Sequence, residues 1–184
     1  METEGKMNIY IIGYMGTGKT TIGQLLAIKL KRDFFDVDGF IENRYHKTVT
    51  EIFEEKGESG FREIEHRIIQ EISEFENVVV STGGGLPCFF DNMDIMNRTG
   101  ITIYLKASVD ELIGRINLSK QKRPLIKGKS HEELQDFVET NLKKRESFYS
   151  QAKFTFDVPH FNSKQEMNLW VEEMLNKIIH NEQY

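Results

Sequence analysis

The segment MNIYIIGYMGTGKT, residues 7–20, joins a short apolar run to a loop punctuated by glycine. The run is rich in β-branched residues and stops at Gly13, which predicts a buried strand of a parallel sheet. The loop fits the pattern G-x-x-x-x-G-K-[ST], and apolar residues at helical spacing follow it as far as Leu30. A strand, a glycine-rich turn and a helix in this order predict a loop that binds the phosphates of a nucleoside triphosphate.

The residue types in this loop suit the chemistry of phosphate binding. Glycines let backbone N–H groups converge on phosphate oxygens, and the N-terminus of the following helix favours negative charge. Lys19 can reach the β- and γ-phosphates, and the Thr20 hydroxyl group can bind Mg²⁺. A glycine-rich turn that fits the pattern by chance is expected in about one chain in a hundred or fewer. The residues expected to contact the nucleotide here are Gly13, Gly16, Thr17, Gly18, Lys19, Thr20 and Thr21.

Short apolar strands and helical segments alternate along the rest of the chain. Strands are expected at residues 7–12, 34–38, 77–82, 101–105 and 154–157. Helices are expected at residues 20–30, 39–47, 50–56, 61–75, 90–98, 109–117, 131–149 and 163–180. This alternation predicts an α/β fold, with helices on both faces of a parallel sheet. No repeat, low-complexity tract or linker divides the sequence, so residues 1–184 are expected to form a single domain.

Composition excludes several classes of protein. Lys and Arg number 24 against 29 Asp and Glu, and the net charge of −5 argues against a protein that coats nucleic acid or a membrane surface. The single cysteine, Cys88, cannot form an internal disulfide and suits a reducing compartment. The sequence has neither a signal-peptide core nor a run of 18 apolar residues. We therefore expect a cytoplasmic protein, a monomer, without nucleic-acid or membrane partners.

Two observations separate the chain from GTPases. Residues 36–39, DVDG, match the D-x-x-G motif of GTPases in letters, but they begin only a helix length beyond Thr20. That spacing leaves no room for an intervening switch segment and strand. The guanine-binding pattern Asn-Lys-x-Asp is also absent from the sequence. ATP is therefore the expected nucleotide.

Asp36 and Asp38 alternate at the carboxyl end of the second expected strand, where ligands bind in open α/β sheets. One carboxylate can support Mg²⁺ through water, and the other can orient or deprotonate an attacking hydroxyl group. An ordinary helix N-cap is the alternative role for Asp38. Ser81 and Thr82 stand where an acidic residue usually ends the next buried strand, so Asp36 is the best candidate for Mg²⁺.

An arginine and three glycines further along could hold an acceptor molecule. Arg62 stands at an expected helix start with Glu65 three residues on, and arginine can bind a carboxylate or phosphate with two hydrogen bonds. A surface salt bridge within the helix is the alternative. Gly83, Gly84 and Gly85 follow a buried strand and would let the backbone approach a ligand closely, or would simply form a flexible turn.

Basic residues gather in a window between 120 and 129, which contains five Lys or Arg and no acid. A mobile loop that brought Arg123 over the phosphates would exclude water and stabilise charge on the transferring group. A solvated basic loop is the alternative. Arg145 stands on the helix expected at 131–149, and it too could either contact a ligand or lie on a solvated basic surface.

Taken together in order and spacing, these motifs resemble the shikimate kinase family over about residues 8–180. The loop at 13–20 resembles the phosphate loop of that family. Arg115 resembles an arginine that packs on adenine, and Arg123-Pro124-Leu125 resembles the segment with the lid arginine. Two further segments resemble those that hold the shikimate carboxylate in that family. The first is Gly60-Phe61-Arg62 with Glu65, and the second contains Arg145, four residues before Tyr149. The aspartates at 36 and 38 and the glycines at 83–85 resemble the residues around the substrate hydroxyl group and ring.

The resemblance implies a fold like that of nucleoside-monophosphate kinases, a three-layer sandwich with a five-stranded parallel sheet. It implies a substrate-binding region near 33–62 and a lid near 118–130. It further implies transfer of the γ-phosphate of ATP to the 3-hydroxyl group of shikimate, a step toward chorismate and the aromatic amino acids. The residues expected to be catalytic are Lys19, Asp38 and Arg123, with Mg²⁺ on Thr20 and, through water, on Asp36. The residues expected to bind the acceptor are Asp38, Arg62, Gly83, Gly84, Gly85 and Arg145.

Two alternatives stay open. Another small-molecule kinase of the same architecture, similar to a gluconate kinase, would share the phosphate loop but not two arginines directed at a carboxylate. A non-catalytic nucleotide-binding module would bind ATP without turnover, although Lys19, Asp38 and Arg123 argue against it.

Overall fold

The computed structural model describes residues 7–118 and 130–181, and the structural statements below refer to these two ranges. The strands are β1 (Asn8–Ile12), β2 (Asp33–Asp36), β3 (Val78–Ser81), β4 (Gly100–Lys106) and β5 (Phe154–Asp157). The helices are α1 (Lys19–Leu30), α2 (Val37–Tyr45), α3 (Val49–Ser73), α4 (Asn92–Thr99), α5 (Val109–Leu118), α6 (His131–Tyr149) and α7 (Lys164–Asn181), with a short 3₁₀ helix, η1, at Leu86–Cys88. None of the helices in these ranges is long and apolar enough to cross a membrane.

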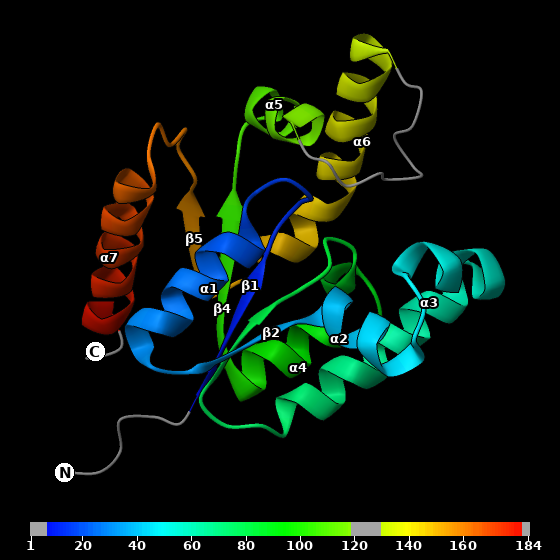
Figure 1. Cartoon of the computed structure of the whole chain (residues 1–184), viewed down its shortest axis with the longest axis horizontal. Helices are drawn as coiled ribbons and strands as arrows, with labels where there is room; N and C mark the ends of the chain where they lie inside the picture. Colours follow the sequence, from blue (N-terminus) through cyan, green and yellow to red (C-terminus); the bar gives the residue numbers. More distant parts are fainter. Residues whose placement is uncertain (1–6, 119–129, 182–184) are drawn as a thin grey trace.

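The strands form one parallel sheet in the order β2-β3-β1-β4-β5 (Figure 1). β1 lies at its centre, with Ile9 paired to Val79 of β3 on one side and to Ile101 of β4 on the other. The prediction of a five-stranded parallel sheet is thereby confirmed. Because all strands run the same way, the loops that follow β1, β2 and β3 meet at one edge of the sheet.

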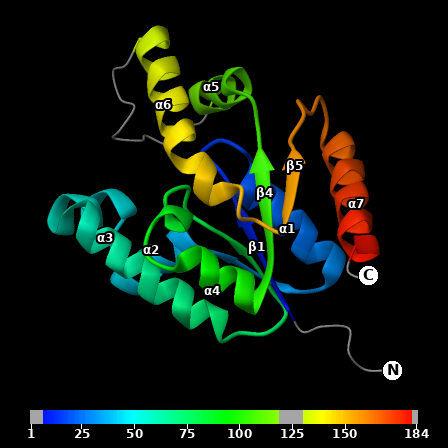
Figure 2. The same cartoon turned by 180° about the vertical axis from the view of Figure 1, so that it is seen from behind.

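Side chains of β1 alternate between two apolar cores, one on each face of the sheet. Ile9 and Ile11 pack with α1 and α7, whereas Tyr10 and Ile12 pack with the helices of the opposite face. Seen from behind, α3, α4 and α6 cover that opposite face (Figure 2). Helices on both faces of one sheet make the three-layer α/β sandwich that the sequence predicts.

The predicted helices occur, with shifted boundaries. The helix expected at 39–47 begins two residues earlier, since Val37 is fully buried and already belongs to α2. The expected helices at 50–56 and 61–75 are the two parts of α3, which are separated by a kink at Gly57, where the backbone is non-helical (φ 67°, ψ −179°). Arg62 therefore lies about one turn after this kink, near the start of the second part of α3. Thr48 caps α3 through a capping box: its hydroxyl group accepts from the backbone N–H of Glu51, and its own backbone N–H donates to the Glu51 carboxylate.

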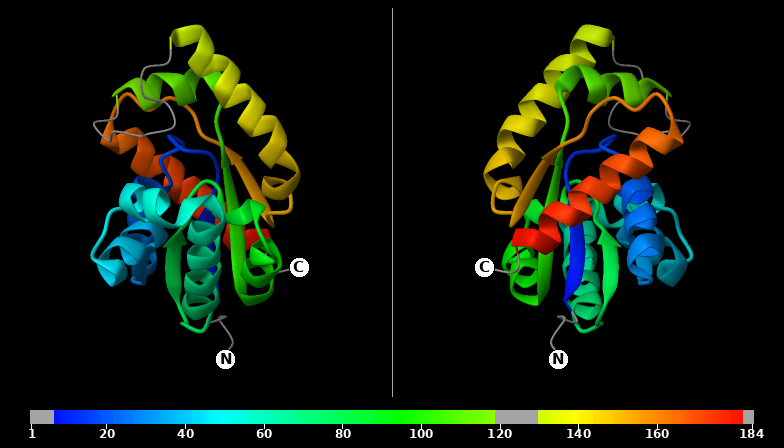
Figure 3. Two further views of the ribbon diagram at one scale, coloured as in Figure 1. Left: turned by 90° about the vertical axis from the view of Figure 1, so that its right-hand side faces the viewer. Right: turned by 90° about the vertical axis from the view of Figure 1, so that its left-hand side faces the viewer.

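α5 and α6 rise beyond the carboxyl ends of the strands, so they stand over the edge where the loops meet (Figure 3). Ser130 caps α6 through a second capping box with Glu133. Ser108 caps α5, since its hydroxyl group accepts a hydrogen bond from the backbone N–H of Glu111. The positions of these two helices bring Arg115 and Arg145 toward the phosphate loop.

Candidate active site

The phosphate loop closes on the carbonyl oxygen of Tyr14. The Thr17 hydroxyl group donates to this oxygen at 2.9 Å, and the Lys19 ammonium group donates to it at 2.8 Å. Gly18 caps α1 in the left-handed conformation (φ 90°), which glycine adopts without steric cost. The amino end of α1 and the Lys19 side chain therefore converge on the loop, as phosphate binding requires.

Thr20 and Asp36 meet at the end of the sheet. The Thr20 hydroxyl group donates to Asp36 Oδ2 at 2.8 Å, and the backbone N–H of Gly39 donates to Asp36 Oδ1 at 3.2 Å. Asp36 is thus the N-cap of α2, so the cap considered for Asp38 in the sequence belongs to Asp36 instead. The reason is that β2 ends at Asp36, which leaves Asp38 in the first turn of the helix.

Asp38 lies beside a second carboxylate at the glycine run. A Cβ atom added at Gly83 would stand 2.7 Å from Glu65 Oε1 and 3.0 Å from Asp38 Oδ1, so both carboxylates approach the backbone there. Glu65 is buried, and this burial raises its pKa to about 7, against the opposing effect of Arg62. The negative charge of Asp38 raises the Glu65 pKa further.

Arg62 is paired and almost fully buried. It donates to Glu65 at 2.6 Å and to Glu58 at 3.1 Å, and its guanidinium carbon lies 4.5 Å from the ring centroid of Phe89. The salt bridge that the sequence offered as an alternative is therefore present, but in the interior and not on the surface. Its buried Nε atom has no hydrogen-bond partner among the described residues, which leaves a donor for a ligand.

Arg145 reaches the same glycine run from α6. Its guanidinium carbon lies 5.3 Å from the centroid of the Tyr14 ring, a cation–π distance. A Cβ atom at Gly84 would stand 3.5 Å from Arg145 Nη1, and one at Gly85 would stand 2.6 Å from the Arg62 guanidinium. Two arginines from different helices thus contact adjacent glycines.

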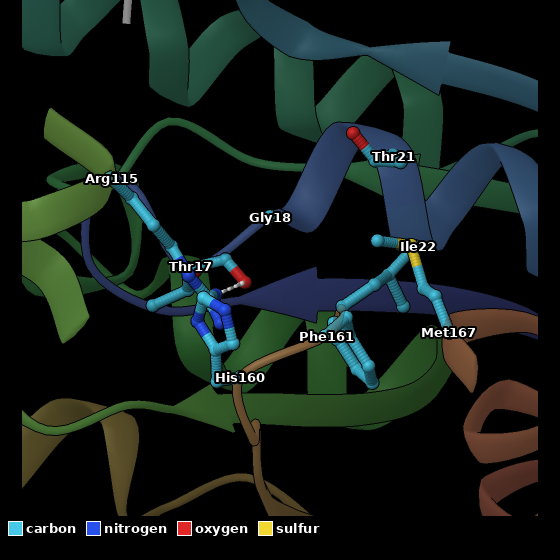
Figure 4. Close-up of a pocket in the computed structure, with 8 residues that line it drawn as sticks. All are labelled: Thr17, Gly18, Thr21, Ile22, Arg115, His160, Phe161 and Met167. Atoms are coloured by element: carbon cyan, nitrogen blue, oxygen red, sulfur yellow. Dashed lines mark hydrogen bonds between the residues drawn. The ribbon is translucent and has the colours of Figure 1, made fainter. Parts of the chain in front are cut away.

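A cavity of about 240 Å³ lies on the other side of the phosphate loop (Figure 4). Its lining residues are Thr17, Gly18, Thr21, Ile22, Arg115, His160, Phe161 and Met167. Arg115 crosses it, donating to the Thr17 carbonyl oxygen at 3.3 Å and to the Pro159 carbonyl oxygen at 2.8 Å. Glu111, one turn earlier on α5, lies 3.2 Å from Arg115 and holds it there.

The chain is similar to proteins of one known family. A family model described as shikimate kinase matches residues 15–180. A shikimate kinase from Parabacteroides distasonis is 54% identical over 149 residues, which cover 81% of this chain and 86% of that protein. The chain belongs to the shikimate kinase family.

Solved structures of the shikimate kinase family share this fold. A shikimate kinase from Bacteroides thetaiotaomicron superposes with a TM-score of 0.90 at 46% identity, covering 94% of this chain and 98% of that chain. One from Acinetobacter baumannii, in complex with shikimate, gives 0.86 at 32% identity, with coverages of 97% and 96%. A gluconokinase from Sinorhizobium meliloti reaches 0.59 at 15% identity, a likeness that shows the shared fold alone. Membership in the shikimate kinase family makes the chain a phosphotransferase with a nucleotide as one substrate.

The structure brings most of the predicted site residues to one edge of the sheet. Those around the phosphate loop and glycine run are Lys19, Thr20, Asp36, Asp38, Arg62, Gly83, Gly84, Gly85 and Arg145. Arg115 and Thr21 line the neighbouring cavity. Arg123, with most of the segment expected to be a lid, lies outside the described residues.

Four residues beside the site carry no motif that the sequence interpretation used: Glu58, Phe89, His160 and Phe161. Glu58 could have been found, because it lies four residues before Arg62 on a helix, the spacing of a favourable ion pair. Phe89, His160 and Phe161 belong to loops without a motif, and only the fold carries them to the site. The positions of these loop residues depend on tertiary packing, so no local sequence pattern predicts them.

Proposed function

We propose that this chain transfers the γ-phosphate of ATP to the 3-hydroxyl group of shikimate, the reaction that leads toward chorismate and the aromatic amino acids. The observation that carries the proposal is the approach of Arg62 and Arg145 to adjacent glycines next to the phosphate loop. Two guanidinium groups at one turn suit a carboxylate, which each can bind with paired hydrogen bonds. The shikimate-bound structure of the Acinetobacter baumannii relative supports the same acceptor.

On the nucleotide side, Lys19 and the backbone of the phosphate loop bind the β- and γ-phosphates of ATP. The cavity beside Thr17 and Gly18 receives the adenine base, against which Arg115 packs. The contact between Arg115 and the Thr17 carbonyl group supports this assignment, because it ties the cavity wall to the phosphate loop.

Mg²⁺ is a further part of the proposal. Thr20 and Asp36 offer a hydroxyl and a carboxylate oxygen 2.8 Å apart beside the loop, and oxygen ligands with negative charge suit this ion. Thr20 would bind the ion directly and Asp36 would bind it through water. When bound, Mg²⁺ would neutralise charge on the β- and γ-phosphates.

Asp38 orients the acceptor hydroxyl group toward the γ-phosphate, and Arg62 and Arg145 fix the opposite end of the acceptor. The close approach of the Asp38 carboxylate to the backbone of Gly83 supports this role of Asp38. Arg123 closes over the phosphates and stabilises the developing charge; this assignment rests on the sequence motif alone, since the residue lies outside the described ranges. Positioning in this way accounts for much of catalysis in phosphoryl transfer. We further propose that the protein acts as a cytoplasmic monomer.

The test is an acceptor screen with the purified wild-type protein. ADP release in the presence of Mg²⁺ is followed with shikimate, gluconate and nucleoside monophosphates, and the product is identified by ³¹P NMR. We expect turnover with shikimate alone and a phosphate monoester at its 3-hydroxyl group. Turnover with gluconate would favour the alternative kinase, and tight ATP binding without any turnover would favour a non-catalytic module.

A further inference from the structure

A buried tyrosine near the end of α6 contacts both parts of the acceptor side. The Tyr149 hydroxyl group donates to the Gly84 carbonyl oxygen at 2.5 Å. The Arg145 guanidinium, one turn earlier on α6, reaches the same glycine, since a Cβ atom at Gly84 would stand 3.5 Å from Arg145 Nη1, and its positive charge acts on the Tyr149 hydroxyl group. The hydroxyl group is protonated at neutral pH and acts as a donor, and burial raises the pKa of Tyr149 further above its ordinary value.

We propose that Tyr149 is a positioning residue of the acceptor site, which fixes the Arg145 guanidinium relative to the glycine run. An arginine side chain has many rotamers, and holding it in one of them lowers the entropy that ligand binding must remove. Tyr149 performs this from one side, while the ring of Tyr14 lies against the same guanidinium. The inference rests on the proposed function, because it assigns Arg145 to the carboxylate of the acceptor.

The chain offers a matched control in Tyr104. It is also buried, and its ring centroid lies 5.0 Å from that of Tyr149 in the same core. Its hydroxyl group, however, donates at 3.0 Å to the carboxylate of Glu146, which is partly exposed. Tyr104→Phe therefore removes a hydroxyl group at similar depth without removing a bond to the glycine run.

The kinetic test compares Tyr149→Phe with Tyr104→Phe and wild type, with shikimate as the varied substrate. For Tyr149→Phe we expect KM for shikimate to rise about fivefold, the value of one neutral hydrogen bond, with kcat and the KM for ATP within about twofold. For Tyr104→Phe all three constants should stay within about twofold. Equal changes in the two variants would overturn the inference, because a merely structural tyrosine would act through stability alone.

A second comparison isolates the coupling to Arg145. In an Arg145→Ala background, Tyr149→Phe should cause no further rise in KM for shikimate, since the side chain that it positions is gone. A full fivefold rise on that background would contradict the assignment.

A third measurement needs no acceptor and so separates the two proposals. In ¹⁵N NMR, the Arg145 Nε–H group should be more mobile in Tyr149→Phe than in wild type or Tyr104→Phe. Unchanged mobility would overturn the positioning role even if shikimate is the acceptor. Increased mobility in a protein that does not phosphorylate shikimate would refute the proposed function and leave the positioning role standing.

Discussion

The Thr20 hydroxyl group donates to the Asp36 carboxylate at 2.8 Å, and this bond joins the start of α1 to the end of β2. The two elements meet although β3 lies between β1 and β2 in the sheet. β3 itself ends in Ser81 and is followed by Thr82, so no carboxylate stands at its own end. Asp36, at the end of the edge strand β2, therefore supplies the negative charge that Mg²⁺ beside the phosphate loop would need.

Asp36→Asn should weaken the use of Mg²⁺ while the fold stays intact. Asparagine caps a helix about as well as aspartate, so α2 should keep its N-cap. Loss of the charge should raise the Mg²⁺ concentration for half-maximal activity about tenfold, the usual effect of removing an outer-sphere partner. The measurement is a Mg²⁺ titration of the initial rate at saturating ATP.

Asp36→Ala is the companion variant, because it removes both the charge and the cap. It should shift the Mg²⁺ titration in the same way and also lower the free energy of unfolding by about 1 kcal/mol. A Mg²⁺ requirement equal to that of wild type in either variant would show that Asp36 serves only as a cap.

Gly85→Ala should disrupt the acceptor site through contact alone. The backbone of Gly85 is compatible with alanine (φ −89°), but the new Cβ atom would stand 2.6 Å from the Arg62 guanidinium. Displacement of that group should raise KM for shikimate about tenfold and lower the free energy of unfolding by about 1–3 kcal/mol.

The matched control for this variant is Gly114→Ala in α5, where nothing lies within 4 Å of the added atom. Gly114→Ala should stabilise the protein by about 0.5–1 kcal/mol, because glycine in the interior of a helix is less stable than alanine by about this amount. Its kinetic constants should equal those of wild type. If Gly85→Ala behaved in the same way, the close contact with Arg62 would be without functional consequence.

Arg62→Lys should separate charge from geometry at the acceptor site. Lysine keeps a positive charge beside the buried Glu65, which protects the fold, but it cannot form the two parallel hydrogen bonds of a guanidinium. KM for shikimate should rise about tenfold or more with little change in the KM for ATP. Arg67→Lys, at an exposed position on the same helix, should change neither constant.

The raised pKa of Glu65 predicts a pH dependence of stability. Between its ordinary value of 4.5 and its folded value of about 7, the folded protein retains a proton that the unfolded chain has released. The contribution of Glu65 to the free energy of unfolding therefore falls as pH rises through this window, by up to about 3 kcal/mol. Above the window, this contribution stays constant.

Urea unfolding of wild type and Glu65→Gln near pH 5 and near pH 8 checks this prediction. Glutamine does not titrate, so the variant should gain stability relative to wild type as pH rises. A stability difference that stays constant across the two pH values would show that Glu65 is ionised throughout.

The local features of the fold were predictable from short stretches of sequence. The strand, glycine loop and helix at 7–30 require no distant partner to be recognised, and Thr48 and Glu51 signal a helix start through a contact that spans three residues. Even the break at Gly57 fell between two predicted helices, because that backbone conformation is accessible almost only to glycine. The predicted helix boundaries were wrong where burial and not the local pattern decides them. Val37 is an example, because it is fully buried and α2 begins there, two residues before the predicted start.

For the site, sequence alone supplied the chemical groups but not their surroundings. The motif at residues 13–20 determined a phosphate loop by itself, since a tight anion-binding turn needs its glycines, lysine and threonine in one continuous segment. Only the tertiary structure decided that Arg62 is buried against Glu65 and that it meets Arg145 at the glycine run. These contacts join α3, α6 and the end of β3, and they depend on how the helices pack on the sheet, which no local pattern encodes.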